Sequence, residues 1–158
     1  MVPSRHPSKG SFERKEVYRS RTDYRVLSAN QELNCSLVEL QPLKLKKHQF
    51  QVHLADKLCC ILGDRIYSGR VREILGVPIL VDPQQAAIGT QTIPEPMREA
   101  LGLRPWHLSR LPLFLHWHQV TLPKWYLDRN VTITAPLPGY FSQALDRLGL
   151  TGGIEGTR

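Results

Sequence analysis

The sequence predicts an α+β fold: a single small domain with one mainly antiparallel sheet and two or three short helices. Apolar and polar residues alternate over several short runs, which is typical of half-buried strands. Twelve prolines and eleven glycines in 158 residues interrupt the chain too often for long helices. Strands and helices do not alternate in a regular βαβ order, which favours the α+β class.

The N-terminal third is expected to contain an arm followed by strands. Residues 1–12 hold two prolines, a glycine and three serines, which predicts a flexible basic arm before a domain spanning 13–150. Residues 13–27 mix β-favouring side chains with arginines and suit an edge strand. The run at 33–37 alternates strictly and predicts a strand. The runs at 43–45 and 50–54 alternate out of phase, so a turn or a bulge is expected near 46–48.

The middle of the chain is less regular. The apolar run at 58–62 fits a buried strand or a buried helical turn. Residues 71–75 have the spacing of a short amphipathic helix closed by Gly76, and 77–81 favour a short strand. A helix is expected to follow Thr92, with Glu95 in its first turn, and to end at Gly102.

Two strands and one helix are predicted for the C-terminal third. The strands are expected at 111–122 and 131–134. Apolar residues at helical spacing over 141–148 predict a helix closed by Gly149. The glycine-rich segment 151–158 is expected to be a flexible tail.

The net charge of +7 lies entirely in the first 72 residues, which hold 14 Lys or Arg and 7 Asp or Glu, whereas the remainder holds seven of each. A basic face attracts nucleic acid, an anionic lipid surface or an acidic partner, and the alternative is an ordinary solvated basic surface. The candidate phosphate contacts are Arg14, Lys15, Arg19, Arg21, Arg25, Lys44, Lys46, Lys47, Arg70 and Arg72.

An aromatic cluster lies in the half of the chain without net charge. Its most prominent members are Trp106, Trp117, Trp125 and Tyr126. Large aromatic side chains serve most often in a core, next in a partner interface and least often in base stacking. The segment 105–126 is therefore a candidate protein interface.

Catalytic and metal signals are weak. His116 and His118 stand two residues apart and would share one face of a strand, but no third ligand is near, so they are weak metal candidates. Cys59 and Cys60 are expected to be buried free thiols with a raised pKa. A nucleophile elbow and a glycine-rich phosphate loop are both missing, so no catalytic residue and no cofactor is predicted.

These patterns favour a small basic binding protein over an enzyme, and they predict that its N-terminal half contacts nucleic acid, RNA above all. The alternative is a protein–protein adaptor or assembly factor that uses residues 105–126. A metal-dependent enzyme built on His116 and His118 ranks third. Without an apolar leader or a span of membrane length, the expected location is cytoplasmic or nuclear and the protein is not secreted. The oligomeric state stays open.

Overall fold

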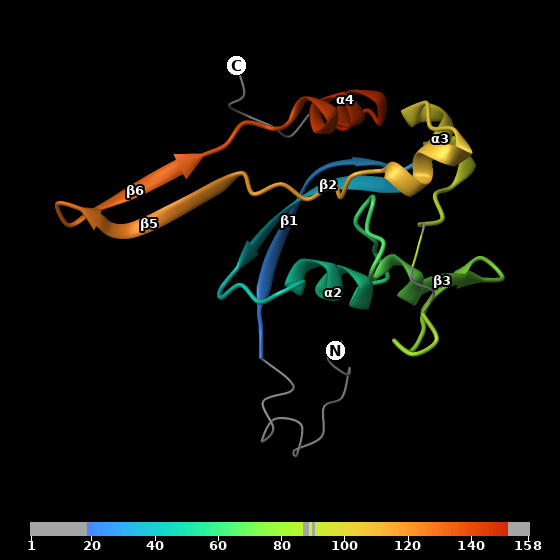
Figure 1. Ribbon diagram of the computed structural model, residues 1–158, viewed down its shortest axis with the longest axis horizontal. Coiled ribbons are helices and arrows are strands. Elements are labelled where there is room, and N and C mark those ends of the chain that lie inside the picture. The colour runs from blue at the N-terminus through green and yellow to red at the C-terminus, as the bar shows by residue number, and fades with distance from the viewer. Residues whose placement is uncertain (1–18, 87–88, 90, 152–158) are drawn as a thin grey trace, which may run out of the picture.

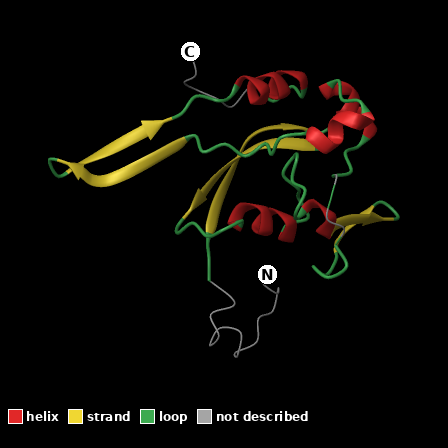
Figure 2. Cartoon of the chain, in the orientation of Figure 1, coloured by secondary structure: helices red, strands yellow, loops and turns green. Residues whose placement is uncertain are grey.

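The computed structural model describes residues 19–86, 89 and 91–151. Their strands form three separate antiparallel sheets of two strands each, combined with helices (Figures 1 and 2). The predicted α+β class is confirmed, but the strand pairing is divided among three hairpins instead of one sheet. The arm at 1–12 and nearly all of the tail at 151–158 lie outside the described residues.

The first hairpin pairs β1 (Thr22–Asn30) with β2 (Cys35–Pro42) and confirms the strand expected at 33–37. Asn30 stabilises the turn, because its Oδ1 accepts a hydrogen bond from the Leu33 amide at 3.1 Å. Its Nδ2 donates to the Leu148 carbonyl at 2.9 Å. One side chain therefore both closes the hairpin and fastens it to the C-terminal helix.

The predicted strand at 50–54 is wrong, because these residues belong to helix α2 (Gln49–Asp56). His48 has a left-handed conformation with φ 58° and lies at the point where the chain enters the helix, so the expected change of direction at 46–48 is present. The helix packs Val52 and Ala55 against Tyr67. The helix is buried on several sides, so its apolar residues are not confined to one helical face. Their spacing in the sequence therefore resembles the alternation that predicts a strand.

The predicted helix at 71–75 is also wrong. The 3-10 turn η1 (Ser68–Arg70) leads into β3 (Val71–Ile74), which pairs with β4 (Val77–Leu80). Leu75 and Gly76 connect the two strands, both with positive φ. Gly76 therefore closes a hairpin and not a helix.

The main core lies between α4 (Gly139–Arg147) and α3 (Glu95–Leu101), and both helices were predicted. Leu101 packs with Phe141, Leu145 and Leu148. Gly102 and Gly149 follow these helices with φ 66°, the left-handed conformation in which glycine commonly ends a helix. The N-cap of helix α3 is Pro94, two residues after the expected cap at Thr92. The 3-10 helix η2 (Pro105–Arg110) follows α3.

The third hairpin, β5 (Gln119–Tyr126) and β6 (Arg129–Thr134), extends away from the rest of the described chain (Figure 1). The strand predicted at 131–134 is confirmed. Only the last part of the strand predicted at 111–122 forms, because residues 111–118 have no strand partner. No helix in the described ranges is both long and apolar enough to cross a membrane.

Candidate nucleic-acid interface

The loop that carries Lys46 and Lys47 is held in place by Gln49, the first residue of α2. The Gln49 side chain is 4% exposed, and its Nε2 donates to the Arg21 carbonyl at 3.0 Å and to Thr22 Oγ1 at 2.9 Å. Its Oε1 accepts the Lys46 amide at 3.0 Å. A buried amide needs such partners for both of its ends. Gln49 thereby ties the basic loop to the start of β1.

A second wall comes from the extended segment 111–118, and Gly63 makes its position possible. Gly63 has φ 80°, and a Cβ on it would lie 1.9 Å from the Pro112 carbonyl oxygen. The Phe114 amide donates to the Leu62 carbonyl at 2.8 Å beside this contact. Only a residue without a side chain allows so close an approach. The contact sets the direction in which the chain continues toward Trp117.

His116 and His118 point to one backbone oxygen. His116 Nε2 and His118 Nδ1 donate to the Ala135 carbonyl at 3.2 and 2.9 Å, so each imidazole has one nitrogen fixed in a hydrogen bond. The pair thus fastens segment 111–118 to the chain after β6. Across the described residues, no three His, Cys, Asp or Glu side chains gather as they would around a metal ion.

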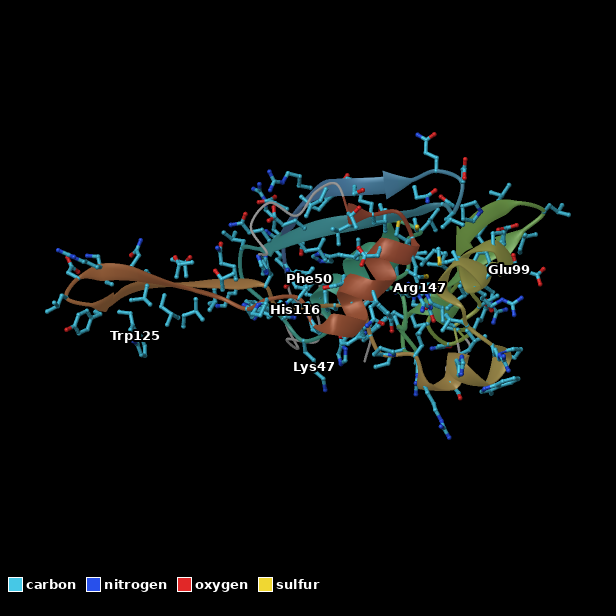
Figure 3. All side chains as sticks on the ribbon, turned by 90° about the horizontal axis from the view of Figure 1, so that it is seen from above. Lys47, Phe50, Glu99, His116, Trp125 and Arg147 are labelled. Carbon is cyan, nitrogen blue, oxygen red and sulfur yellow. The ribbon has the colours of Figure 1, made fainter. Side chains whose placement is uncertain are left out.

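The two walls enclose a groove of about 460 Å³, which we call the α2 groove. Figure 3 shows Lys47, Phe50 and His116 in neighbouring positions beside it. The groove is lined by Leu45, Lys46, Lys47, His48, Gln49, Phe50, Gln51, Leu115, His116 and Trp117. Lys46 and Lys47 were predicted as phosphate contacts and Trp117 as part of a protein interface. The structure brings these separate candidates together.

The lining of the α2 groove combines cations with aromatic surface. Two ammonium groups and two imidazoles stand beside the Trp117 indole, which is 49% exposed, and no carboxylate belongs to the lining. Lys side chains neutralise phosphates, and an exposed aromatic ring offers a face on which an unpaired base stacks. The groove therefore suits a single-stranded nucleic acid.

The other described basic candidates do not line the α2 groove. Arg21 pairs with Asp23 at 2.9 Å and Arg25 with Glu39 at 3.2 Å, both on the surface of the first hairpin. Arg72 donates to the Gln85 carbonyl at 3.1 Å. Arg19 and Lys44 are exposed, whereas Arg14 and Lys15 lie outside the described residues.

Arg70 differs from the other candidates because its side chain is only 5% exposed. Its Nη1 lies 3.9 Å from Asp56 Oδ1, and neither Nη1 nor Nε has a hydrogen-bond partner. A guanidinium in this position does not reach a ligand at the surface. We therefore leave Arg70 out of the interface.

The remaining aromatic candidates lie apart from the α2 groove. Trp106 is 62% exposed in η2, where the Arg104 guanidinium lies 5.4 Å from its ring centre. Trp125 and Tyr126 are 71% and 65% exposed at the far end of the third hairpin. Figure 3 shows Trp125 on the extended hairpin, well away from Lys47.

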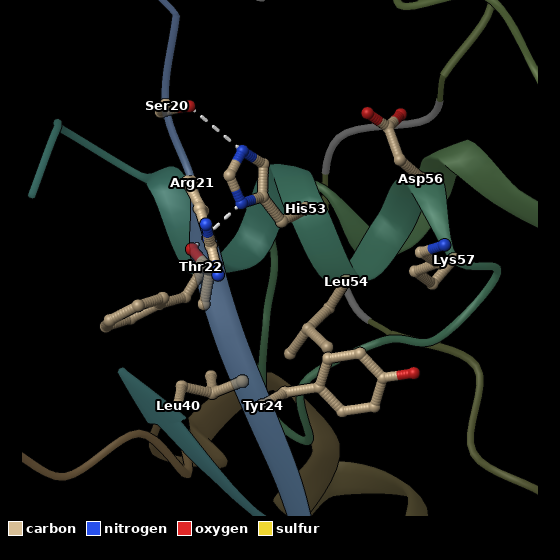
Figure 4. A pocket seen from close by; sticks show the side chains of 10 residues that line it. Ser20, Arg21, Thr22, Tyr24, Leu40, His53, Leu54, Asp56 and Lys57 are labelled. Atoms are coloured by element: carbon tan, nitrogen blue, oxygen red, sulfur yellow. Dashed lines mark hydrogen bonds between the residues drawn. The ribbon is translucent and has the colours of Figure 1, made fainter. Parts of the chain in front are cut away.

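A smaller pocket of about 350 Å³ lies between β1 and α2, and Phe50 lines it as well as the α2 groove (Figure 4). His53 connects its walls, with Nε2 at 3.0 Å from Ser20 Oγ and Nδ1 at 2.9 Å from Thr22 Oγ1. These polar groups satisfy one another. We interpret them as the fastening of α2 to β1.

The prediction that Cys59 and Cys60 are buried is wrong, since both residues are exposed in the loop after α2. The Cys60 sulfur is nevertheless shielded enough that burial, together with Asp64 and Cys59, raises the pKa of its thiol to about 11. The expected rise in the thiol pKa is therefore found at Cys60 despite its exposure.

The sequence analysis missed Gln49 and Gly63, which position the two walls. A glutamine between two alternating runs gives no signal of burial, because glutamine is mostly exposed in proteins. Gly63 was seen only as the end of the run at 58–62. Its φ and the close approach of Pro112 depend on a segment fifty residues away.

The chain is similar to RNA pseudouridine synthases. It is 37% identical over 150 residues to the human mitochondrial mRNA pseudouridine synthase RPUSD3. The aligned residues cover 94% of this chain and 42% of that protein. It is 37% identical over 135 residues to the mitochondrial pseudouridylate synthase RPUSD4 of Danio rerio, covering 85% of this chain and 33% of that protein. No family model matches the chain.

A solved structure gives the same result. Human RNA pseudouridylate synthase domain containing 4 superposes with a TM-score of 0.64 at 34% identity, over 82% of this chain and 42% of that one. The chain thus spans between one third and about two fifths of the length of these relatives.

These relatives support RNA binding and correct two predictions. The prediction that the chain is more probably not an enzyme is contradicted, because the relatives are named pseudouridine synthases. The predicted cytoplasmic or nuclear location is contradicted as well, because RPUSD3 and RPUSD4 are named mitochondrial.

Proposed function

We propose that this chain is part of an RNA pseudouridine synthase of mitochondria and that the α2 groove holds a single-stranded segment of the RNA substrate. The similarity to RPUSD3 supports the class of enzyme. The observation that carries the site is the meeting of Lys46 and Lys47 with Trp117 in one groove whose lining has no carboxylate.

The roles follow from the chemistry of the lining. Lys46 and Lys47 contact phosphates, and the exposed face of Trp117 receives an unstacked base. Gln49 keeps the basic loop in register with β1, while the His116 imidazole holds the wall that carries Trp117. RNA presented in this way is placed without reading much of its sequence.

Binding of a fluorescent single-stranded RNA, measured by anisotropy at several salt concentrations, tests the site. Two phosphate contacts predict that the double change Lys46→Gln and Lys47→Gln flattens the slope of log affinity against log salt by about 1.4. Trp117→Ala should lower affinity by roughly tenfold, since stacking contributes about 1–3 kcal/mol per base. Trp125→Ala is the matched control, with an equally large but distant indole. Equal losses for both tryptophans would refute the groove.

Formation of pseudouridine tests the enzymatic part. The chain, alone and with the unmatched part of human RPUSD3 supplied separately, is incubated with an RNA transcript, and pseudouridine is detected by carbodiimide labelling and primer extension. We expect product that the Lys46→Gln/Lys47→Gln variant reduces. RNA binding without any product in either arrangement would refute the enzymatic part and leave the interface standing.

A further inference from the structure

The hairpin of β5 and β6, which we call the ribbon, has two chemically different faces. Directly paired residues of an antiparallel hairpin share a face. Val120 pairs with Ile133 and Leu122 with Val131, so these four residues make one face apolar. Thr121 pairs with Thr132, with 3.1 Å between their hydroxyl oxygens, and Gln119 pairs with Thr134 on the opposite, polar face.

In the described part of the chain, the apolar face lies outside both hydrophobic clusters, with Val120, Leu122 and Val131 half-buried and Ile133 exposed. Neither strand belongs to either hydrophobic cluster, and the two strands pack mainly on each other. The ribbon accordingly extends away from the remaining elements (Figure 1). Ile133 is 52% exposed, and Leu127 at the tip is 77% exposed.

A two-stranded ribbon with an apolar face is not expected to be stable by itself. A hairpin of two strands is at best marginally stable in water without a surface to pack on. Lys124, Leu127 and Asp128 also have positive φ near the tip, a conformation that is unfavourable for side chains larger than glycine. Packing of the apolar face on another surface would supply the missing stabilisation.

The chemistry of the ribbon points to a polypeptide and not to RNA as the occupant. Its charged residues are Lys124, Asp128 and Arg129, and Lys124 is paired with Asp128 at 3.4 Å. This leaves little charge for phosphates, whereas the α2 groove is rich in cations. Four aliphatic side chains on one face match the apolar side of another strand or helix.

We propose that the apolar face of the ribbon docks against polypeptide equivalent to the part of the RNA pseudouridine synthases that this chain does not match. The inference rests on the relationship proposed above, because the relatives contain about three fifths of additional sequence that could supply the surface. Val120 and Ile133 lie at the centre of the contact, and Thr121 and Thr132 face away from it.

The test is co-expression of the full chain with the unmatched part of human RPUSD3 carrying an affinity tag. The wild-type chain should be captured as a salt-resistant complex. Ile133→Lys should lower capture by at least about tenfold, because it places a charge in an apolar contact. Thr132→Lys is the matched control on the neighbouring position of the same strand and should leave capture unchanged. Ile133→Thr, which keeps a β-branched side chain, should give an intermediate loss.

Each outcome decides the proposal. Failure to capture the wild-type chain, or equal losses for Ile133→Lys and Thr132→Lys, overturns it. Light scattering of the chain alone that shows a dimer abolished by Ile133→Lys would assign the face to a second copy instead. RNA affinity measured on the same variants separates the two proposals, and Ile133→Lys should retain it. If all three changes impair capture equally and RNA affinity is lost as well, the ribbon is misfolded and the docking contact is overturned.

Discussion

Among Gly→Ala substitutions at the described glycines, Gly63→Ala should lower the free energy of unfolding most. A residue with a Cβ at φ 80° costs about 1–2 kcal/mol in the left-handed region. The new Cβ would also lie 1.9 Å from the Pro112 carbonyl oxygen, so the backbone must move by more than 1 Å, which adds roughly 1–3 kcal/mol of overpacking. The expected loss in the free energy of unfolding is about 2–5 kcal/mol.

Thermal and urea unfolding measure this loss. For a chain of this size, it corresponds to a fall in Tm of about 4–20 °C. Gly76→Ala is the matched control, because its φ is 77° but no atom lies within 4 Å of the added Cβ. The difference between the two variants isolates the contact with Pro112. Since this contact leads into the wall that carries Trp117, Gly63→Ala should also weaken RNA binding, and Gly76→Ala should not. Equal Tm changes for the two variants would refute the reasoning.

Three further changes test other parts of the structure. Leu75→Asn creates an Asn-Gly turn between β3 and β4 at a residue with φ 52° and 99% exposure, so it should stabilise the chain by about 0.5–1 kcal/mol; a lower Tm would contradict this. The pKa of Cys60 is raised from 9.0 to about 11, so its thiolate is scarce below that pH. Alkylation at pH 8, followed by peptide mass spectrometry, should be about a hundredfold slower than in the urea-unfolded chain, and equal rates would disprove the shielding. Arg70→Met removes the ion pair that Arg70 makes with Asp56 at 3.9 Å. Because the Asp56 side chain is 35% exposed and Nη1 and Nε of Arg70 lack hydrogen-bond partners, the free energy of unfolding should fall by only about 1–3 kcal/mol. RNA affinity should be unchanged by Arg70→Met, and a loss as large as that for the lysine variants would return Arg70 to the interface.

The sequence predicts elements best where a local signal and a tertiary contact agree. In α4, Phe141, Leu145 and Leu148 lie at helical spacing and form the core, so periodicity and packing coincide. In α2, buried Gln51 stands between Phe50 and Val52 and buried Gln49 precedes Phe50, so the sequence alternates as a strand would. At 71–76, Gly76 has positive φ both in a hairpin turn and at a helix end, so the glycine alone does not distinguish them.

The sequence predicted the lysines and the tryptophan of the candidate site separately, because long-range contacts bring them together. Lys46 and Lys47 are about seventy residues from Trp117, and their meeting depends on hydrogen bonds of Gln49 and on the close approach of Pro112 to Gly63. These contacts involve a polar side chain and a glycine, neither of which contributes to a hydrophobic period. Composition therefore indicated the two chemistries of the site, while nothing local to either segment indicated that they share a groove.

The distribution of charge partners bears on the proposed interface more directly than the net charge of +7 does. In the first 72 residues the arginines at 21, 25 and 70 have Asp or Glu partners, which cancel much of their long-range field. The carboxylates involved lie on β1, on β2 and at the end of α2, and none of them lines the α2 groove. The positive potential is therefore weakened around these three arginines. An RNA strand attracted by the overall charge would find cations and an exposed indole together in the α2 groove.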